Sequence, residues 1–187
     1  SEALVKEGVV PEKDFAKIKT GAEQWNADPK GFVERAKEIE KLRNHDVIAF
    51  TEAVAEKIND TASRWFHFGL TSSDIVDTAF AVQMVQSADS RRAAVDKLLP
   101  IIARRANEHK MTPCIGRSHG IHAEPTTFGL KLALMHDEFR RALERLKRAR
   151  EVVASGKLSG AVGTNAHLSP SVEEYVCQQL GLRSAPI

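Results

Sequence analysis

One uninterrupted run of helical periodicity, from Thr126 to Ala154, constrains the fold of this chain more than any other feature. Its apolar side chains recur at spacings of three and four, which places them on one face of a helix. At about 1.5 Å per residue this helix would be roughly 43 Å long. Such a length is typical of an elongated helical bundle, and we expect the helix to be shared between subunits. The apolar positions are Phe128, Leu132, Met135, Phe139, Leu143, Leu146 and Val153.

Helical spacing also covers most of the remaining chain. A short helix is expected to begin after Pro11 and to end near Gly21, and a second one covers Phe32 to Arg43. Asn44 is a candidate N-cap for the helix that follows. A longer apolar-periodic run extends from Thr71 to Lys110. The chain is therefore expected to be mostly helical before residue 112 as well.

The last predicted helix, Pro170 to Leu180, has a cap at Ser169 and a stop at Gly181. No stretch shows the alternation of apolar and polar residues that is typical of a strand. We therefore expect an all-α fold. Residues 1–70 are predicted to form an N-terminal helical domain with a truncated start, and residues 71–187 the first part of an elongated, long-helix bundle, which is itself truncated.

The composition excludes several classes of protein. Apolar residues make up 42% of the 187 residues, too many for a disordered chain, and no apolar run is long enough for a membrane span. The net charge of +2, from 27 basic and 25 acidic residues, gives no whole-chain signal for nucleic acid. Two unpatterned cysteines, Cys114 and Cys177, are typical of a reducing compartment. Since the N-terminus also lacks a signal-peptide pattern, we expect a cytoplasmic protein.

Two segments interrupt the helical pattern. Thr112 to Pro125 contains two prolines and two glycines, and Ser155 to Asn165 contains three glycines. Irregular stretches of this length inside a helical bundle are usually functional or disordered. The first segment includes His119 between a serine and a glycine, where an imidazole can accept or donate a proton at neutral pH. An inert, hydrogen-bonded histidine in a polar loop fits the same pattern equally well.

Two further interpretations of these segments are a metal site and a loop that binds the phosphates of a nucleotide. His119 and His122 have an H-x-x-H spacing with Glu124 nearby, but no further Cys or His cluster completes a tetrahedral site. The glycine-rich segment Ser155 to Asn165 lacks the G-x-x-x-x-G-K-[ST] order of a phosphate-binding loop. The residues therefore support neither a metal site nor nucleotide hydrolysis.

Helix starts provide a second kind of candidate site. Thr71, Ser72 and Asp74 form a capping pattern, and a helix N-terminus with several hydroxyls can also bind an anion. His45 is expected in the first turn of a helix, whose positive end favours a neutral imidazole. A surface histidine is the simpler interpretation of His45, and a packed histidine is the simpler one of His67. The sequence leaves these alternatives open.

Four segments resemble adenylosuccinate lyases, a family within the fumarase/aspartase superfamily, and the most specific element is HGIHAEPTT. The resemblance implies an all-helical homotetramer in which each active site combines three subunits. It also implies two reactions of purine biosynthesis that release fumarate, one from adenylosuccinate to give AMP and one from the succinyl-aminoimidazole-carboxamide ribotide. Neither reaction implies a metal or another cofactor. The segments are HDVIAF from His45, FGLTSSDIVDT from Phe68, GRSHGIHAEPTTFGLKLAL from Gly116 and GKLSGAVGT from Gly156.

The resemblance assigns roles to individual residues. His119 matches the general acid that protonates the departing nitrogen. The substrate-binding positions include Asn44, which stands where the family commonly has arginine, and His67, which matches a histidine near the site. The other substrate-binding positions are His45, Thr71, Ser72 and Ser118. The family's serine-bearing loop, S-S-x-M-P-x-K-x-N-P, is expected beyond Ile187, so this chain by itself is expected to have no turnover.

Two other functions remain as alternatives. Another lyase of the same superfamily would share the mechanism and differ in the leaving group. A non-catalytic helical scaffold would use the helix from Thr126 for oligomerisation, but it would leave the polar segment around His119 unexplained. The preferred prediction is an adenylosuccinate-lyase-type C–N lyase.

Overall fold

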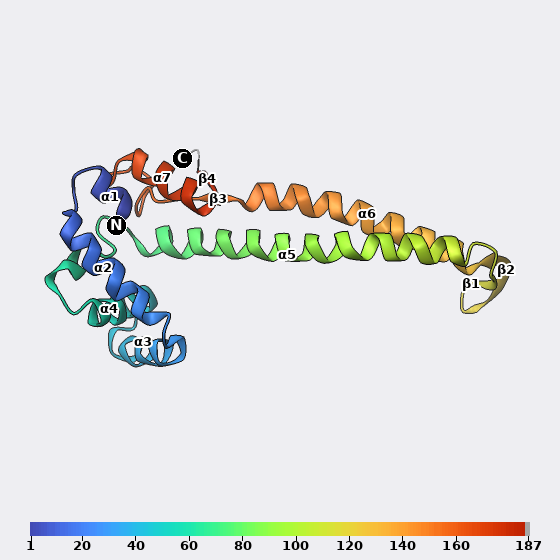
Figure 1. Cartoon of the computed structure of the whole chain (residues 1–187), viewed down its shortest axis with the longest axis horizontal. Helices are drawn as coiled ribbons and strands as arrows, with labels where there is room; N and C mark the ends of the chain where they lie inside the picture. The colour runs from blue at the N-terminus through green and yellow to red at the C-terminus, as the bar shows by residue number, and fades with distance from the viewer. Residues whose placement is uncertain (186–187) are drawn as a thin grey trace. The chain divides into compact units, whose positions relative to one another are not determined.

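The computed structural model describes residues 1–185 and is predominantly helical, which confirms the predicted all-α class (Figure 1). In chain order the elements are α1 (Glu2–Lys6), α2 (Glu12–Trp25), α3 (Pro29–Arg43), α4 (Asp46–Ile58), the 3₁₀ helix η1 (Thr61–Trp65), α5 (Ser72–Glu108), β1 (Pro113–Ser118), β2 (Ile121–Thr127), α6 (Phe128–Val153), β3 (Ser155–Gly156), α7 (Pro170–Leu180) and β4 (Arg183–Ser184). Among the described residues, no helix combines the length and the apolar character needed to cross a membrane.

The chain divides into two compact units, which we describe separately. The first unit contains Ser1–Phe80 together with the described residues from Ser155 onward, and the second contains Ala81–Ala154. This division differs from the predicted domains, because the C-terminal segment packs with the N-terminal helices. Contacts between α1 and α7 and between α7 and β3 belong to the first unit. The predicted domain boundary at residue 70 stays a prediction for the longer protein.

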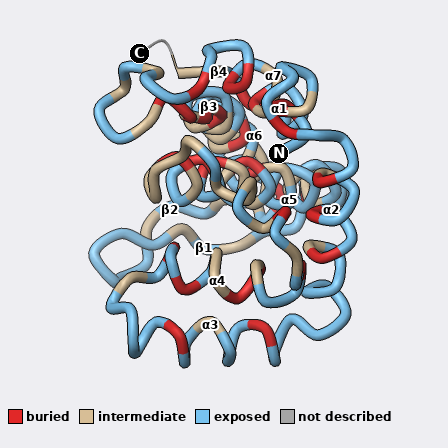
Figure 2. The backbone as a smooth tube through the Cα atoms, turned by 90° about the vertical axis from the view of Figure 1, so that its left-hand side faces the viewer, coloured by how far each residue is buried: buried red, intermediate tan, exposed pale blue. Residues whose placement is uncertain are grey.

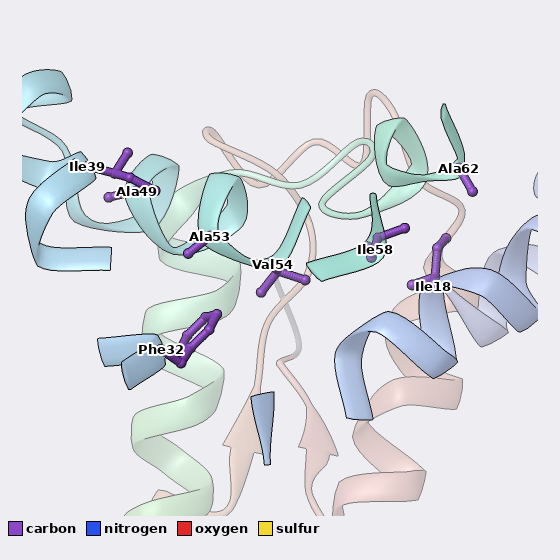
Figure 3. Close-up of a cluster of buried hydrophobic side chains, with 8 residues drawn as sticks. All are labelled: Ile18, Phe32, Ile39, Ala49, Ala53, Val54, Ile58 and Ala62. Atoms are coloured by element: carbon purple, nitrogen blue, oxygen red, sulfur yellow. The ribbon is translucent and has the colours of Figure 1, made fainter. Parts of the chain in front are cut away.

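Helices α2, α3 and α4 form the main core of the first unit. Figure 3 shows Phe32 of α3 in one cluster with Ala53 and Val54 of α4. Buried positions recur along α3 and are separated by exposed stretches, as expected for a helix with one apolar face (Figure 2). The complete set of buried residues in this cluster is Ile18, Phe32, Ile39, Ala49, Ala53, Val54, Ile58 and Ala62.

Asn44 ends one helix rather than beginning the next. Its φ of 52° is left-handed, and its N–H donates to the Glu40 carbonyl at 2.7 Å, which makes it the C-cap of α3. The N-cap of α4 is His45, so the predicted capping role of Asn44 was wrong. Asparagine tolerates the left-handed region better than most residues, which suits it to a helix C-terminus.

The second unit is a pair of long antiparallel helices joined by a β-hairpin (Figure 1). The residues of α5 from Ala81 onward continue through Pro100 to Glu108 without interruption. The two helices approach closely at Gly129, where an added Cβ would lie 2.4 Å from the Ala106 carbonyl oxygen. Farther along, Arg150 Nη2 pairs with Asp89 Oδ2 at 3.1 Å. Only Leu143 of the apolar stripe predicted for α6 is buried.

The β-hairpin formed by β1 and β2 corrects the expectation that the chain contains no strand. Both strands lie at the edge of a two-stranded sheet, where Pro113 and Pro125 are tolerated. The register shifts at Gly116, where an added Cβ would lie 2.7 Å from the Glu124 carbonyl oxygen. Most side chains of the hairpin are exposed, so it does not need the alternation that marks a half-buried strand.

Gly21 of α2 provides a test of the helix packing in the first unit. An added Cβ would lie 2.5 Å from Cα of Ile58 and 2.9 Å from its backbone nitrogen. Helix propensity alone favours Gly21→Ala by about 1 kcal/mol. We expect the substitution instead to destabilise the protein by about 1–3 kcal/mol, because a backbone atom of α4 cannot move aside as a side chain can.

Thermal unfolding measures this change. The control is Lys19→Ala, at an exposed position of the same helix, which should change stability by no more than about 0.5 kcal/mol. A Gly21→Ala variant with a higher melting temperature than the wild type would contradict the close approach of α2 and α4.

Candidate functional site

The predicted site residues are distributed over both compact units. Asn44, His45, His67, Thr71 and Ser72 lie in the first unit, and Ser118 and His119 lie in the second. The structure thus provides two groups of candidate residues.

His45 and Ser72 are joined by a hydrogen bond between two helix starts. Nδ1 of His45 accepts from the Ile48 N–H at 3.4 Å, which caps α4. Nε2 lies 3.3 Å from Oγ of Ser72, the first residue of α5. A ring that accepts at Nδ1 is neutral and carries its proton on Nε2, so that it donates to Ser72. The side chain is 40% exposed, and Asp46 Oδ1 also lies 3.3 Å from Nδ1. Asp46 Oδ1 also accepts from the Val47 N–H at 2.7 Å.

His67 is a partly buried histidine in the left-handed region, with a φ of 68°. Its Nε2 is buried, and no group among residues 1–185 forms a hydrogen bond with it. Burial lowers the pKa of His67 below its ordinary value of 6.5, and the Asp74 carboxylate partly offsets this shift. His67 therefore favours the neutral imidazole near neutral pH, and its buried Nε2 has no hydrogen-bond partner among the described residues.

The first turn of α5 is capped by Asp74. The Thr71 N–H donates to Asp74 Oδ2 at 2.9 Å, which forms the acidic half of the predicted capping box. The Thr71 hydroxyl forms no hydrogen bond to any of the described residues. The hydroxyl is therefore not the group that caps the helix.

Asp74 also joins α5 to the glycine-rich segment from Gly156 to Asn165, which we call the glycine loop. Its side chain is fully buried, with 0% exposure. Its Oδ1 accepts from Lys157 Nζ at 2.7 Å and from the Gly160 N–H at 3.2 Å. Sequence reasoning assigned no role to Asp74 beyond the cap and none to Lys157. The two residues are far apart in the chain, so no local pattern indicated that they pair.

The glycine loop is held by side chains of two helices. Thr78 Oγ1 donates to the Lys157 carbonyl and accepts from the Lys157 N–H, each at 3.0 Å. The buried Glu173 of α7 accepts from the Leu158 N–H at 2.6 Å. Farther along the loop, the side-chain oxygens of Ser159 and Asn165 are buried without a partner among the described residues. The start of the loop is therefore fixed, and its later part retains unsatisfied polar atoms.

His119 occupies the two-residue turn of the β-hairpin. Ser118 pairs with Ile121, which leaves His119 and Gly120 between the strands with φ values of 54° and 76°. Two consecutive positive φ values are typical of a type I′ turn. Histidine is one of the residues that reach this region more readily than most. Ser118 and His119 are both exposed, so the hairpin presents the imidazole at its tip.

The H-x-x-H alternative places His122 on β2, opposite Arg117, with Glu124 two residues farther along. Within the part of the chain that the structure describes, no three His, Cys, Asp or Glu side chains gather closely enough to hold a metal ion. Among the described residues, the hairpin therefore presents individual polar side chains and no group of metal ligands.

The comparisons with known proteins place this chain in a family. A family model described as lyase matches residues 1–186, so the chain belongs to the lyase family. Adenylosuccinate lyase of Bacillus subtilis (strain 168) is 48% identical over 186 residues, and that of Streptococcus mutans is 47% identical. Each match covers 100% of this chain and 41% of the relative. The chain thus spans about two fifths of the length of these relatives, and the resemblance found in the sequence is confirmed.

Solved structures show the same fold. A fumarate lyase from Mesorhizobium sp. BNC1 matches with a TM-score of 0.84 and 29% identity, over 100% of this chain and 44% of that chain. The β-carboxy-cis,cis-muconate cycloisomerase of Acinetobacter calcoaceticus sp. ADP1 matches with a TM-score of 0.88 and 27% identity, over 99% and 44% of the two chains. Proteins named for different reactions thus share this helical arrangement.

The free hydroxyl of Thr71 leads to a prediction about stability. Thr71→Ala should change the free energy of unfolding by no more than about 0.5 kcal/mol, because the Asp74 carboxylate provides the cap. The matched control is Thr127→Ala, since the Thr127 hydroxyl accepts from the Leu130 N–H at 3.2 Å and caps α6. That loss should be about 1 kcal/mol. Equal losses in the two melting temperatures would show that the Thr71 hydroxyl caps α5 after all.

Proposed function

We propose that the full-length protein containing this chain eliminates fumarate from adenylosuccinate, giving AMP, and from the succinyl-aminoimidazole-carboxamide ribotide. The observation that carries this proposal is the difference in identity. Adenylosuccinate lyases are 44–48% identical over the whole chain, whereas the structural neighbours named for other reactions are 27–29% identical. The segments that carry the resemblance also contain His45, Thr71 and Ser72 of the first unit and Ser118 and His119 of the second.

The proposed reaction requires one base and one acid. The base removes a proton from the carbon beside a carboxylate of the succinyl group. The electron pair of that C–H bond forms the double bond of fumarate, the C–N bond breaks, and the nitrogen gains a proton. We assign the acid to His119, whose exposed position on the hairpin turn supports proton transfer to a ligand. We expect the base from the family's serine loop, outside these 187 residues.

We propose that the anionic groups of the substrate bind at the beginning of α5. The free N–H groups of a helix N-terminus and its positive dipole end favour anions. The Thr71 hydroxyl is free among the described residues, and the Ser72 hydroxyl accepts from His45 while keeping its own proton to donate. His67 adds a buried Nε2 without a partner. Asn44, the C-cap of α3, directly precedes His45 and is the remaining candidate for substrate binding in this unit.

The assignment of His119 is tested in the full-length protein by His119→Ala. Turnover should fall by about 10²–10⁴, the usual contribution of a general acid, and it is measured as fumarate release by ultraviolet absorbance. His122→Ala is the matched control, because this exposed histidine lies on the same hairpin. Its turnover should remain near that of the wild type.

Other outcomes support the alternatives. A near-normal rate for His119→Ala would remove this residue from the mechanism. Equal losses of turnover for His119→Ala and His122→Ala would indicate that the two histidines act together and would support the metal-site interpretation of the H-x-x-H spacing. Fumarate release from a different succinyl compound, with none from adenylosuccinate, would support another lyase of the superfamily. No saturable substrate binding by the assembled protein would support a helical scaffold.

We also propose that the full-length protein is a cytoplasmic homotetramer with shared active sites. The support is the exposure of the long helices, because Leu130, Leu134 and Val152 of α6 are 58–73% exposed in the single chain. Apolar side chains exposed in such numbers on one helix typically mark an interface. Ile101 of α5 and Met135 of α6 are exposed as well.

Analytical ultracentrifugation of the full-length protein should give the mass of a tetramer. Replacing Leu134 by aspartate should shift the distribution toward smaller species, because a charge would be buried at the interface. Glu138→Asp, at an exposed position of the same helix, is the control and should leave the distribution unchanged. A stable monomer of the wild type would contradict the proposal.

A further inference from the structure

The buried pair of Asp74 and Lys157 lies beside the proposed anion site. Asp74 is the third residue of α5, directly after Ser72 and Ser73, and its side chain is fully buried. A carboxylate removed from water must be matched by donors or by an opposite charge. Asp74 has two backbone N–H donors and one ammonium group, that of Lys157. Lys157 is the only cation that pairs with Asp74 among residues 1–185.

The position of Asp74 creates a conflict for anion binding. Its negative charge stabilises the positive end of α5, but the same charge repels an anion that approaches Thr71 and Ser72. The Lys157 ammonium lies 2.7 Å from Asp74 Oδ1 and cancels this charge locally. The affinity of the site for an anion therefore depends on a lysine that needs no contact with the ligand.

The structure fixes Lys157 at both its backbone and its side chain. Thr78, one turn after Asp74 on α5, forms two hydrogen bonds with the backbone of Lys157. The ammonium also donates to the Gly160 carbonyl, so it bridges α5 and the glycine loop. The Lys157 side chain is 25% exposed, so most of it is removed from water and its charge is poorly screened. The positive charge of Lys157 is thus held at a fixed position beside Asp74.

We propose that Lys157 is a positioning residue for the elimination: by neutralising Asp74 and fixing the glycine loop against α5, it sets the affinity of the Thr71–Ser72 end for the anionic groups of the substrate. This inference rests on the proposed function. It assigns a role to a residue that acts through Asp74 rather than by touching the reacting atoms. The competing explanation is that the Asp74–Lys157 ion pair only stabilises the fold.

Substitutions in the full-length protein separate the two explanations by the sign of their effects. Lys157→Met leaves Asp74 without its cation and should raise KM for adenylosuccinate by roughly 10–50-fold, as expected for one unit charge acting over several ångströms at the effective dielectric of a protein. The value of kcat should change much less. Asp74→Asn leaves the Lys157 charge unopposed and should lower KM, although it also lowers the melting temperature. If the Asp74–Lys157 pair only stabilises the fold, KM should rise for both variants.

The double variant and two controls complete the design. Asp74→Asn combined with Lys157→Met has no net charge at the pair and should return KM to within a few-fold of the wild type. Lys157→Arg keeps the charge and should retain most of the affinity. Lys17→Met removes a lysine from an exposed ion pair with Asp60 in the same unit, and it should leave KM unchanged.

A binding measurement keeps the test independent of turnover and of the folding of Lys157→Met. Inorganic phosphate should raise the melting temperature of the wild type, and it should do so more strongly for Asp74→Asn. A wild type that binds phosphate but releases no fumarate from adenylosuccinate would contradict the proposed function alone. The inference is overturned if Asp74→Asn weakens phosphate binding, if Lys157→Met binds substrate and phosphate as the wild type does, or if phosphate does not stabilise the wild type.

Discussion

The buried carboxylate of Asp74 is the interaction on which the first unit depends most. It caps α5 through the Thr71 N–H, and it pairs with Lys157 and the Gly160 N–H of the glycine loop. Removing one partner of such a pair is far more costly than removing both, because a lone buried charge has no compensation. The start of α5 and the glycine loop are therefore coupled through one side chain.

The arrangement around Asp74 leaves the beginning of α5 both capped and suited to the proposed anion. An acidic residue in the first turn provides the cap, so the hydroxyl of Thr71 is left free. Lys157 offsets the acidic charge from the other side. His45 donates to Ser72 from the neighbouring helix start, which orients that hydroxyl. The cap and the proposed ligand contacts thus use different atoms of the same few residues.

The hairpin solves a different problem, namely how to present one imidazole beyond the end of a long helix pair. A type I′ turn needs two residues in the left-handed region, and here they are His119 and Gly120. Backbone pairing between β1 and β2 holds the turn, and the tight contact at Gly116 sets the register. A flexible loop would leave the imidazole less well ordered before a ligand arrived.

Features with local causes could be predicted from the sequence. The last helix follows its signals, since Ser169 is the N-cap and Gly181 the left-handed C-cap of α7. The start of α6 lies within two residues of the predicted position. The hairpin was missed because its exposed strands need no alternation, and Asn44 was misassigned because asparagine suits both ends of a helix. The site roles of His119 and the other candidates stay predictions.

The sequence by itself determined the approximate positions of the longer helices and which family the chain belongs to, because periodicity, capping residues and short motifs act over a few neighbouring positions. Only the tertiary structure decided that Lys157 meets Asp74 and that Glu173 binds the glycine loop. It also decided that the Thr71 hydroxyl has no partner within residues 1–185. The Lys157–Asp74 pair joins residues 83 positions apart. Such partners are chosen by packing and by the cost of burying a charge, and neither is written in a local pattern.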